Sequence, residues 1–179
     1  SDWSFGSGDF SIDFWVQFND INGDQMLISQ YDDNLNYWLI YKNSQHKLLI
    51  EFTLNGTSKG RYATPTNTIT QANSWYHLEF VREGPTCHIY VNDVEQSLQE
   101  FTPFGVNDVG NISAPLYIAT AIPGNEHFNG WMDELTIEKF AQGAGVPEGA
   151  TIYIQNIDYN PQGQITRIEY GNGTTTYSY

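Results

Sequence analysis

The sequence predicts an all-β protein, built as a sandwich or jelly roll of two antiparallel sheets. Short stretches of alternating apolar and polar residues recur along the chain, separated by turn sequences rich in Gly, Asn and Asp. Helix-period patterns are nearly absent, and aromatic residues make up 15% of the chain, which favours pleated sheet surfaces. Such alternation is typical of antiparallel sheets with one face in the core and one in water.

The first predicted strand, residues 10–18, shows this alternation most clearly. Its apolar series is Phe10, Ile12, Phe14, Val16 and Phe18, and the intervening residues are Ser11, Asp13, Trp15 and Gln17. Further strands are predicted over residues 25–31, 37–42, 47–54, 75–83, 87–96, 115–121 and 131–140. The segments 37–42 and 47–54 form a predicted hairpin around the turn sequence "NSQH".

A change of composition at residues 141–150, "AQGAGVPEGA", predicts the end of the main domain. We expect a main domain over residues 1–142, followed over 143–179 by a Gly/Pro-containing linker and a short C-terminal β extension. The extension contains the turn sequences "NPQG" and "GNG" but too few aliphatic residues for a core of its own. Its strands must pack on the main domain, a neighbouring domain or another subunit.

Composition argues against two classes of partner, nucleic acid and the membrane interior. The chain has 7 Lys and Arg against 21 Asp and Glu, a net charge of −14, so it lacks the clustered cations that nucleic-acid binding needs. No apolar run reaches the roughly 18 residues of a membrane span, which argues against membrane insertion.

Cys87 is the single cysteine, and its place in an alternating strand predicts a buried structural thiol.

Three segments together resemble the laminin G-like domains of the concanavalin A-like lectin/glucanase superfamily. "GSGDFSIDFWVQF" is similar to the opening strand of that family, "WYHLEFVREGPTCHIYVNDVEQ" to its central hairpin, and "HFNGWMDELTIEKF" to its closing strand. Their order and spacing agree over residues 1 to about 140. The resemblance implies a two-sheet antiparallel jelly-roll sandwich of the concanavalin A-like type.

The acidic closing strand could hold catalytic carboxylates, a calcium ligand or only solvated side chains. The jelly-roll glucanases of the superfamily use an E-x-D-x-x-E strand, and a retaining glycosidase needs two carboxyl groups roughly 5 Å apart. When the corresponding segment of this chain is aligned on Asp133, Trp131 and Thr136 occupy the positions of the two glutamates. Both catalytic positions therefore lack a carboxylate, which predicts that the protein is not an enzyme.

The resemblance also implies a structural Ca²⁺ site, because many members of the family hold one. Ca²⁺ binds six to eight oxygen atoms from carboxylates, carbonyl groups and water. By resemblance, Asp133 is the candidate ligand, with Asp9 or its neighbouring carbonyl groups as candidate partners. The alternative is that Asp133 only accepts hydrogen bonds from turn amides.

The tryptophans divide into two groups. The family pattern implies that Trp15, Trp75 and Trp131 belong to the core. Trp38 follows no such pattern, and Tyr37 and Tyr41 lie on the opposite face of its strand. Because an outward aromatic ring can stack on a sugar, Tyr37, Trp38 and Tyr41 are the candidate ligand-binding residues. The alternative is that loops bury both faces of this hairpin.

Together these features predict a non-catalytic binding or adhesion module, with a glycan or surface protein as its partner. By resemblance, its parent would be a larger extracellular, cell-surface or phage structural protein, such as a phage fibre in the virion. The alternative is an assembly module, in which residues 150–179 contact a neighbouring domain or subunit by adding strands to its sheet.

Overall fold

The computed structural model describes residues 3–106, 108–120 and 127–140, together with the backbone of the strands between residues 151 and 176. The strands of the main body are β1 (Asp9–Phe18), β2 (Gln25–Asp33), β3 (Asn36–Lys42), β4 (Leu48–Leu54), β5 (Thr57–Ala63), β6 (Trp75–Glu83), β7 (Thr86–Val91), β8 (Val94–Glu95), β9 (Gln99–Thr102), β10 (Leu116–Ile118) and β11 (Gly130–Phe140). The C-terminal strands are β12 (Thr151–Ile154), β13 (Asn156–Tyr159), β14 (Ile165–Tyr170) and β15 (Gly173–Thr176).

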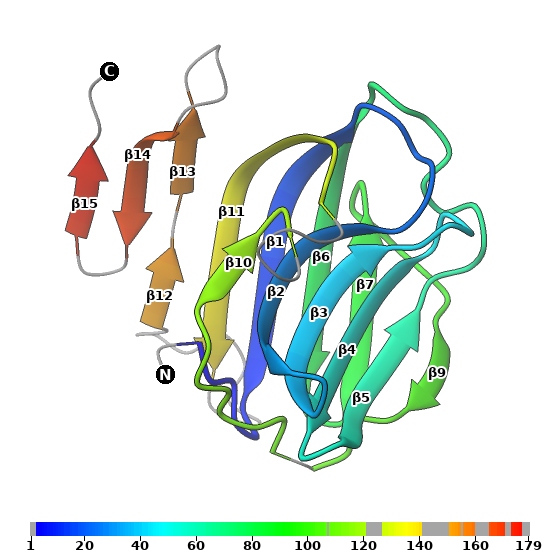
Figure 1. Ribbon diagram of the computed structural model, residues 1–179, viewed down its shortest axis with the longest axis vertical. Coiled ribbons are helices and arrows are strands. Elements are labelled where there is room, and N and C mark those ends of the chain that lie inside the picture. The colour runs from blue at the N-terminus through cyan, green and yellow to red at the C-terminus, as the bar shows by residue number, and fades with distance from the viewer. Residues whose placement is uncertain are drawn as a thin grey trace.

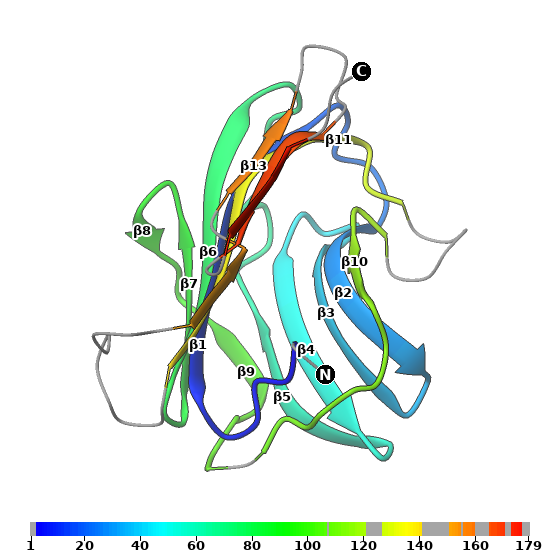
Figure 2. The same ribbon diagram turned by 90° about the vertical axis from the view of Figure 1, so that its left-hand side faces the viewer.

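Two sheets pack face to face (Figure 2). The first sheet has the order β12-β11-β1-β6-β7-β8, and the second has the order β10-β2-β3-β4-β5-β9. The pairings that form the two sheets are antiparallel, and distant segments of the chain are neighbours, such as β1 with β11 and β6. The protein is therefore an all-β, two-sheet jelly-roll sandwich, which confirms the fold class predicted from the sequence.

The core lies between the two sheets and is rich in aromatic rings. The whole apolar series of β1 is buried, with Phe10, Ile12, Phe14, Val16 and Phe18 all at 0% exposure. Phe10 faces Phe52 of the second sheet with ring centroids 5.7 Å apart, while Phe5, from the segment before β1, meets Trp38 at 5.5 Å. Complete burial of such a side chain contributes roughly 1.5–3 kcal/mol, so these contacts hold the layers together.

A β-bulge interrupts the pairing of β1 with β11. Asp13 pairs with Thr136, but Trp15 pairs with Asp133, so β11 has one extra residue in this interval. Glu134 lies in the bulge with a φ of 53°, in the left-handed region that non-glycine residues rarely adopt. As a result, Asp133 and Glu134 are not buried, whereas Met132 and Leu135 on either side of them point into the core.

The C-terminal strands lie beside the first sheet (Figure 1). β12 pairs with β11 and so adds a strand to the edge of that sheet, while β13, β14 and β15 form a separate three-stranded sheet. The extension therefore pairs with the main body of its own chain. The linker predicted over 141–150 lies outside the described residues, and the domain boundary after residue 142 stays a prediction.

Cys87 of β7 carries a free thiol and is 7% exposed, which confirms that it is buried. Burial raises the pKa of this thiol far above its usual value.

Among the residues that the structure describes, there is no helix of the length and hydrophobicity needed to cross a membrane.

Candidate functional site

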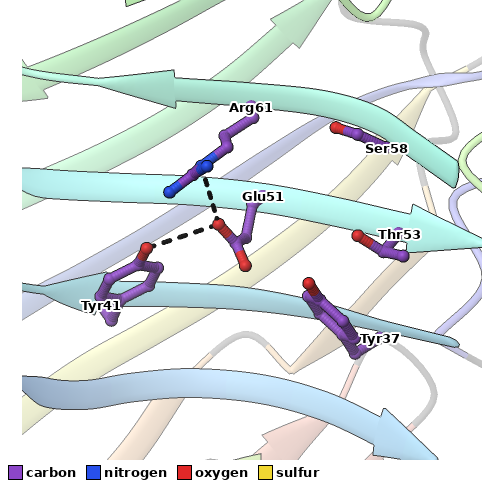
Figure 3. Close-up of a pocket in the computed structure, with 6 residues that line it drawn as sticks. All are labelled: Tyr37, Tyr41, Glu51, Thr53, Ser58 and Arg61. Carbon is purple, nitrogen blue, oxygen red and sulfur yellow. Dashed lines mark hydrogen bonds and ion pairs between the residues drawn. The ribbon is translucent and has the colours of Figure 1, made fainter. Parts of the chain in front are cut away.

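A polar pocket with aromatic walls lies on the outer face of the second sheet (Figure 3). It has a volume of about 340 Å³, which is within the range typical of small-molecule sites. Three adjacent strands supply its lining: Tyr37 and Tyr41 from β3, Glu51 and Thr53 from β4, and Ser58 and Arg61 from β5.

Strand register explains why these side chains meet. Tyr37 pairs with Thr53, which pairs with Ser58, so these three residues form one row across the sheet. Glu51 pairs with Arg61 in the next row. Because residues i and i+2 of a strand share a face, all of them point away from the core.

Glu51 is the electrostatic centre of the pocket. Its Oε2 atom lies 3.1 Å from Nε of Arg61, and it accepts a hydrogen bond of 3.4 Å from the hydroxyl of Tyr41 (Figure 3). Burial and the negative charge of Glu51 raise the pKa of Tyr41 to about 12, so this phenol stays protonated and remains a donor. The Arg61 guanidinium also lies over the Phe101 ring at 5.0 Å, which fixes it at the rim.

This arrangement combines the flat apolar faces of aromatic rings with hydrogen-bond donors and acceptors. Glu51 accepts hydrogen bonds, Arg61 donates them, and the hydroxyl groups of Tyr37, Thr53 and Ser58 can do either. A ligand with several hydroxyl groups and an apolar ring face matches such a surface, because the rings cover its C–H groups while the polar groups satisfy its hydroxyls.

The structure separates the three predicted ligand-binding residues. Tyr37 and Tyr41 lie in the pocket, although whether they bind a ligand stays a prediction. Trp38, the third candidate, is 1% exposed in the core, so its ring cannot stack on a ligand at the surface. Its Nε1 donates a hydrogen bond of 3.0 Å to Oε1 of Gln30, so the indole is satisfied as a structural group.

The predicted pairing of Asp9 and Asp133 around one ion is also wrong. Asp9 pairs with Phe140 and Asp133 with Trp15, so the two carboxylates lie about 20 Å apart along β1 at the usual strand rise. Asp9 instead accepts a hydrogen bond of 2.7 Å from the Gly84 amide, and its charge acts on the buried Arg82.

Asp133 accepts a hydrogen bond of 2.9 Å from the Glu134 amide within the bulge. Among the described residues, no three His, Cys, Asp or Glu side chains are grouped closely enough to hold a metal ion. Calcium binding by Asp133 stays a prediction.

Sequence reasoning missed four residues of the pocket: Glu51, Thr53, Ser58 and Arg61. The signal for Glu51 and Thr53 was present, because both lie on the polar side of the alternating segment 48–54. Ser58 and Arg61 carried a weaker signal, since residues 57–63 alternate poorly and the register of β5 with β4 shifts between Phe52 and Thr53.

The fold is a two-sheet antiparallel β-sandwich of the jelly-roll type, with the pocket on the outer face of its second sheet. The sequence profile of the laminin G type within the concanavalin A-like lectin/glucanases superfamily matches residues 1–144. The chain therefore belongs to this superfamily, as the resemblance of three segments of the sequence indicated.

Solved structures share the fold at low sequence identity. A candidate carbohydrate-binding protein from Bacteroides ovatus matches 98% of this chain with a TM-score of 0.59 and 15% identity. Domain 4 of an extracellular arabinanase from Geobacillus stearothermophilus, in complex with arabinotriose, matches 78% with a TM-score of 0.56 and 19% identity. The LG4-5 domains of the mouse laminin α1 chain match 88% with a TM-score of 0.55 and 11% identity.

The match spans only part of each of these structures: 53% of the Bacteroides ovatus protein, 63% of the arabinanase domain and 40% of the laminin fragment. No curated protein matches the chain in sequence. At these identities the likeness establishes the fold alone.

Proposed function

We propose that this chain is a non-catalytic glycan-binding module. The observation that carries the proposal is the pocket of Tyr37, Tyr41, Glu51 and Arg61, which presents phenol rings beside a fixed carboxylate and guanidinium. Membership of the superfamily supports it. Further support comes from structures of the same fold that hold sugars, such as arabinotriose on the arabinanase domain and sialyllactose on a carbohydrate-binding module from Ruminococcus gnavus.

The pocket is suited to binding rather than to bond cleavage. Arg61 and the hydroxyl of Tyr41 both contact Oε2 of Glu51, so Oε1 can accept a hydrogen bond from a ligand. A retaining glycosidase would need a second carboxyl group about 5 Å away. Glu51 is the one carboxylate among the described residues that line the pocket.

Screening on a glycan array tests the proposal. We expect Tyr37→Ala and Glu51→Gln each to reduce binding of the glycans retained by the wild type by about tenfold or more, because the first removes a stacking ring and the second replaces a charged acceptor with a neutral amide. Tyr90→Ala is the matched control, since Tyr90 is a half-buried tyrosine of β7 in the other sheet. Equal binding by all four proteins, with unchanged melting temperatures, would refute this pocket as the site.

The parent protein is part of the proposal. A module of this kind acts outside the cell, at the cell surface or on a virion, where glycans are displayed. Binding through one small pocket is weak, so useful retention would come from repetition of the module or from neighbouring domains.

An assembly role is the second candidate, favoured by the C-terminal strands. β12 already covers the edge of β11, and β15 has β14 as its partner within the described strands, which leaves the other edge of β15 for strand addition. Deletion of residues 155–179 keeps β12 and removes that edge. Loss of oligomers with intact glycan binding would support assembly through β15, and a monomer before and after deletion would refute it.

A further inference from the structure

Three tryptophans gather on the outer face of the first sheet, the face opposite to the proposed pocket. The side chains of Trp15, Trp75 and Trp131 are 36%, 44% and 44% exposed, contrary to the core positions that the family resemblance implied. Contiguous apolar surface in contact with water is unusual on a folded protein, so three partly exposed indoles on one face indicate an interaction surface. We call these three residues the tryptophan platform.

Register places the platform in two adjacent rows. Gln17 of β1 pairs with Trp131 of β11 on one side and with Trp75 of β6 on the other, so the two indoles flank one amide about 10 Å apart. In the next row Trp15 pairs with both Asp133 and His77. The platform is therefore wider than one sugar ring and has hydrogen-bonding groups set between its rings.

The β-bulge of β11 adds carboxylates to the same face. Trp15, Trp75, Asp133 and Glu134 line an open hollow of about 290 Å³. Glu134 reaches the hollow because its left-handed backbone, with a φ of 53°, turns a second successive carboxylate away from the core. Backbone strain of this kind persists where the surrounding structure holds it and is common at binding sites.

The charge of this face selects the ligand. Asp133 and Glu134 line the hollow, and Asp13 and Asp93 lie on either side of His77, whose ring stacks on Trp15. A sulfated, uronic or sialylated chain would be repelled by these carboxylates, and so would nucleic acid. Hydroxyl groups, in contrast, can donate to Asp133 and Glu134 while the sugar rings stack on the indoles.

We propose that the tryptophan platform is a second binding site, which takes a neutral oligosaccharide or polysaccharide chain. The site lies on the opposite sheet from the Tyr37–Arg61 pocket and does not depend on it. The indoles hold the apolar ring faces of successive sugars, and Gln17, Asp133 and Glu134 hold their hydroxyl groups.

Affinity gel electrophoresis tests this site with laminarin, xylan and galactomannan as neutral probes and polygalacturonate as the anionic probe. We expect at least one neutral polysaccharide to retard the wild type and polygalacturonate not to. Trp75→Ala and Trp131→Ala should each weaken that retardation about tenfold, a loss of stacking energy of ordinary size. Leu35→Ala is the control, because Leu35 is an exposed apolar residue (54%) in the turn between β2 and β3 of the other sheet.

Each outcome decides between this proposal and another. Loss of retardation in Tyr37→Ala, with Trp75→Ala and Trp131→Ala unchanged, would assign all binding to the pocket and overturn the platform site. Retardation by polygalacturonate alone would overturn it as well. Size-exclusion chromatography tests the remaining alternative, in which the platform is a contact between two copies of the chain. That alternative would hold if the wild type is a dimer, if Trp131→Ala dissociates it, and if no neutral probe retards the protein.

A second readout guards against variants that fold poorly. The probe that retards the protein should change the intrinsic tryptophan emission of the wild type, and the change should shrink in Trp131→Ala at an unaltered melting temperature. Absence of any emission change at saturating probe would contradict direct contact with the indoles.

Discussion

The indole of Trp15 stacks on the imidazole of His77, with ring centroids 5.0 Å apart and ring planes inclined by 22°. The same imidazole lies between two carboxylates, with Nε2 2.7 Å from Asp13 Oδ2 and Nδ1 2.9 Å from Asp93 Oδ1. Burial lowers the pKa of His77, but the hydrogen bonds and charges of Asp93 and Asp13 outweigh that effect and raise it above 6.5. For Asp13, burial outweighs the attraction of His77, and its pKa is also raised.

This relationship predicts a pH-dependent stability. A histidine whose folded pKa lies above its unfolded value stabilises the protein below about pH 6.5, and the contribution is lost as the pH rises through the folded pKa. We therefore expect His77→Gln to lower the melting temperature more at about pH 5.5 than at about pH 8.5. Thermal unfolding over this range measures the difference. Repeating it in an Asp13→Asn background should reduce the pH dependence, whereas an equal loss at every pH would contradict the ion pair.

Trp38→Ala should destabilise the fold. The ring is buried against Phe5 and Phe52, and its loss leaves a cavity and removes the Nε1–H group that donates to Oε1 of Gln30. We expect a loss of about 3–5 kcal/mol in the free energy of unfolding, measured by urea denaturation. Trp131→Ala, the partly exposed counterpart, should cost clearly less, because 44% of Trp131 is already in contact with water. Similar losses in the two variants would mean that the burial assigned to these residues is wrong.

Gly130→Ala should be far more damaging than Gly84→Ala. A Cβ atom at residue 130 would lie 2.0 Å from the backbone oxygen of Gln17, so β11 would have to move away from β1. Gly84 has a φ of 56° and nothing within 4 Å of such an atom, so the same change costs only the left-handed backbone, roughly 1–2 kcal/mol. Urea denaturation of both variants compares the costs. A smaller loss for Gly130→Ala than for Gly84→Ala would contradict the close approach of β1 and β11.

Asp9→Asn should lower the melting temperature equally in calcium and in EDTA. Asp9 acts as a structural group, because it accepts the Gly84 amide and its charge faces the buried Arg82. Removing one charge of a buried pair is typically costly whether or not an ion is present. The predicted calcium site at Asp133 is tested in the same experiment: a calcium-dependent rise in melting temperature should disappear in Asp133→Asn and persist in Asp9→Asn.

The alternation of polarity carried the correct information about most of the fold, and β1 shows why. Its apolar series all enters the core, and Trp15 shares its face with Ser11, Asp13 and Gln17 in the sequence. The alternation of faces along β1 alone therefore places Trp15 on the outer face of the sheet. The family pattern suggested the core instead, because it matches residue types and does not determine which face of the strand meets the other sheet.

The candidate site was harder to predict for two physical reasons. In β3 both faces carry large apolar residues, and Lys42 ends the inward series with its buried Nζ donating to the carbonyl groups of Ile21 and Gly23. Alternation therefore could not show that Trp38 faces inward and Tyr37 outward. The prediction that Asp9 and Asp133 share an ion was wrong because it rested on the two strands being neighbours and did not consider their register. The antiparallel register of β1 and β11 places the two residues far apart along the strands.

The single cysteine gives the protein a practical property. Cys87 is 7% exposed, and burial raises the pKa of its thiol, so little thiolate is available to react with a maleimide at neutral pH. A fluorophore or spin label can therefore be attached at one engineered surface cysteine without first removing the native one. Labels placed in turn beside each sheet's outer face would report occupancy of the two faces separately in the intact protein.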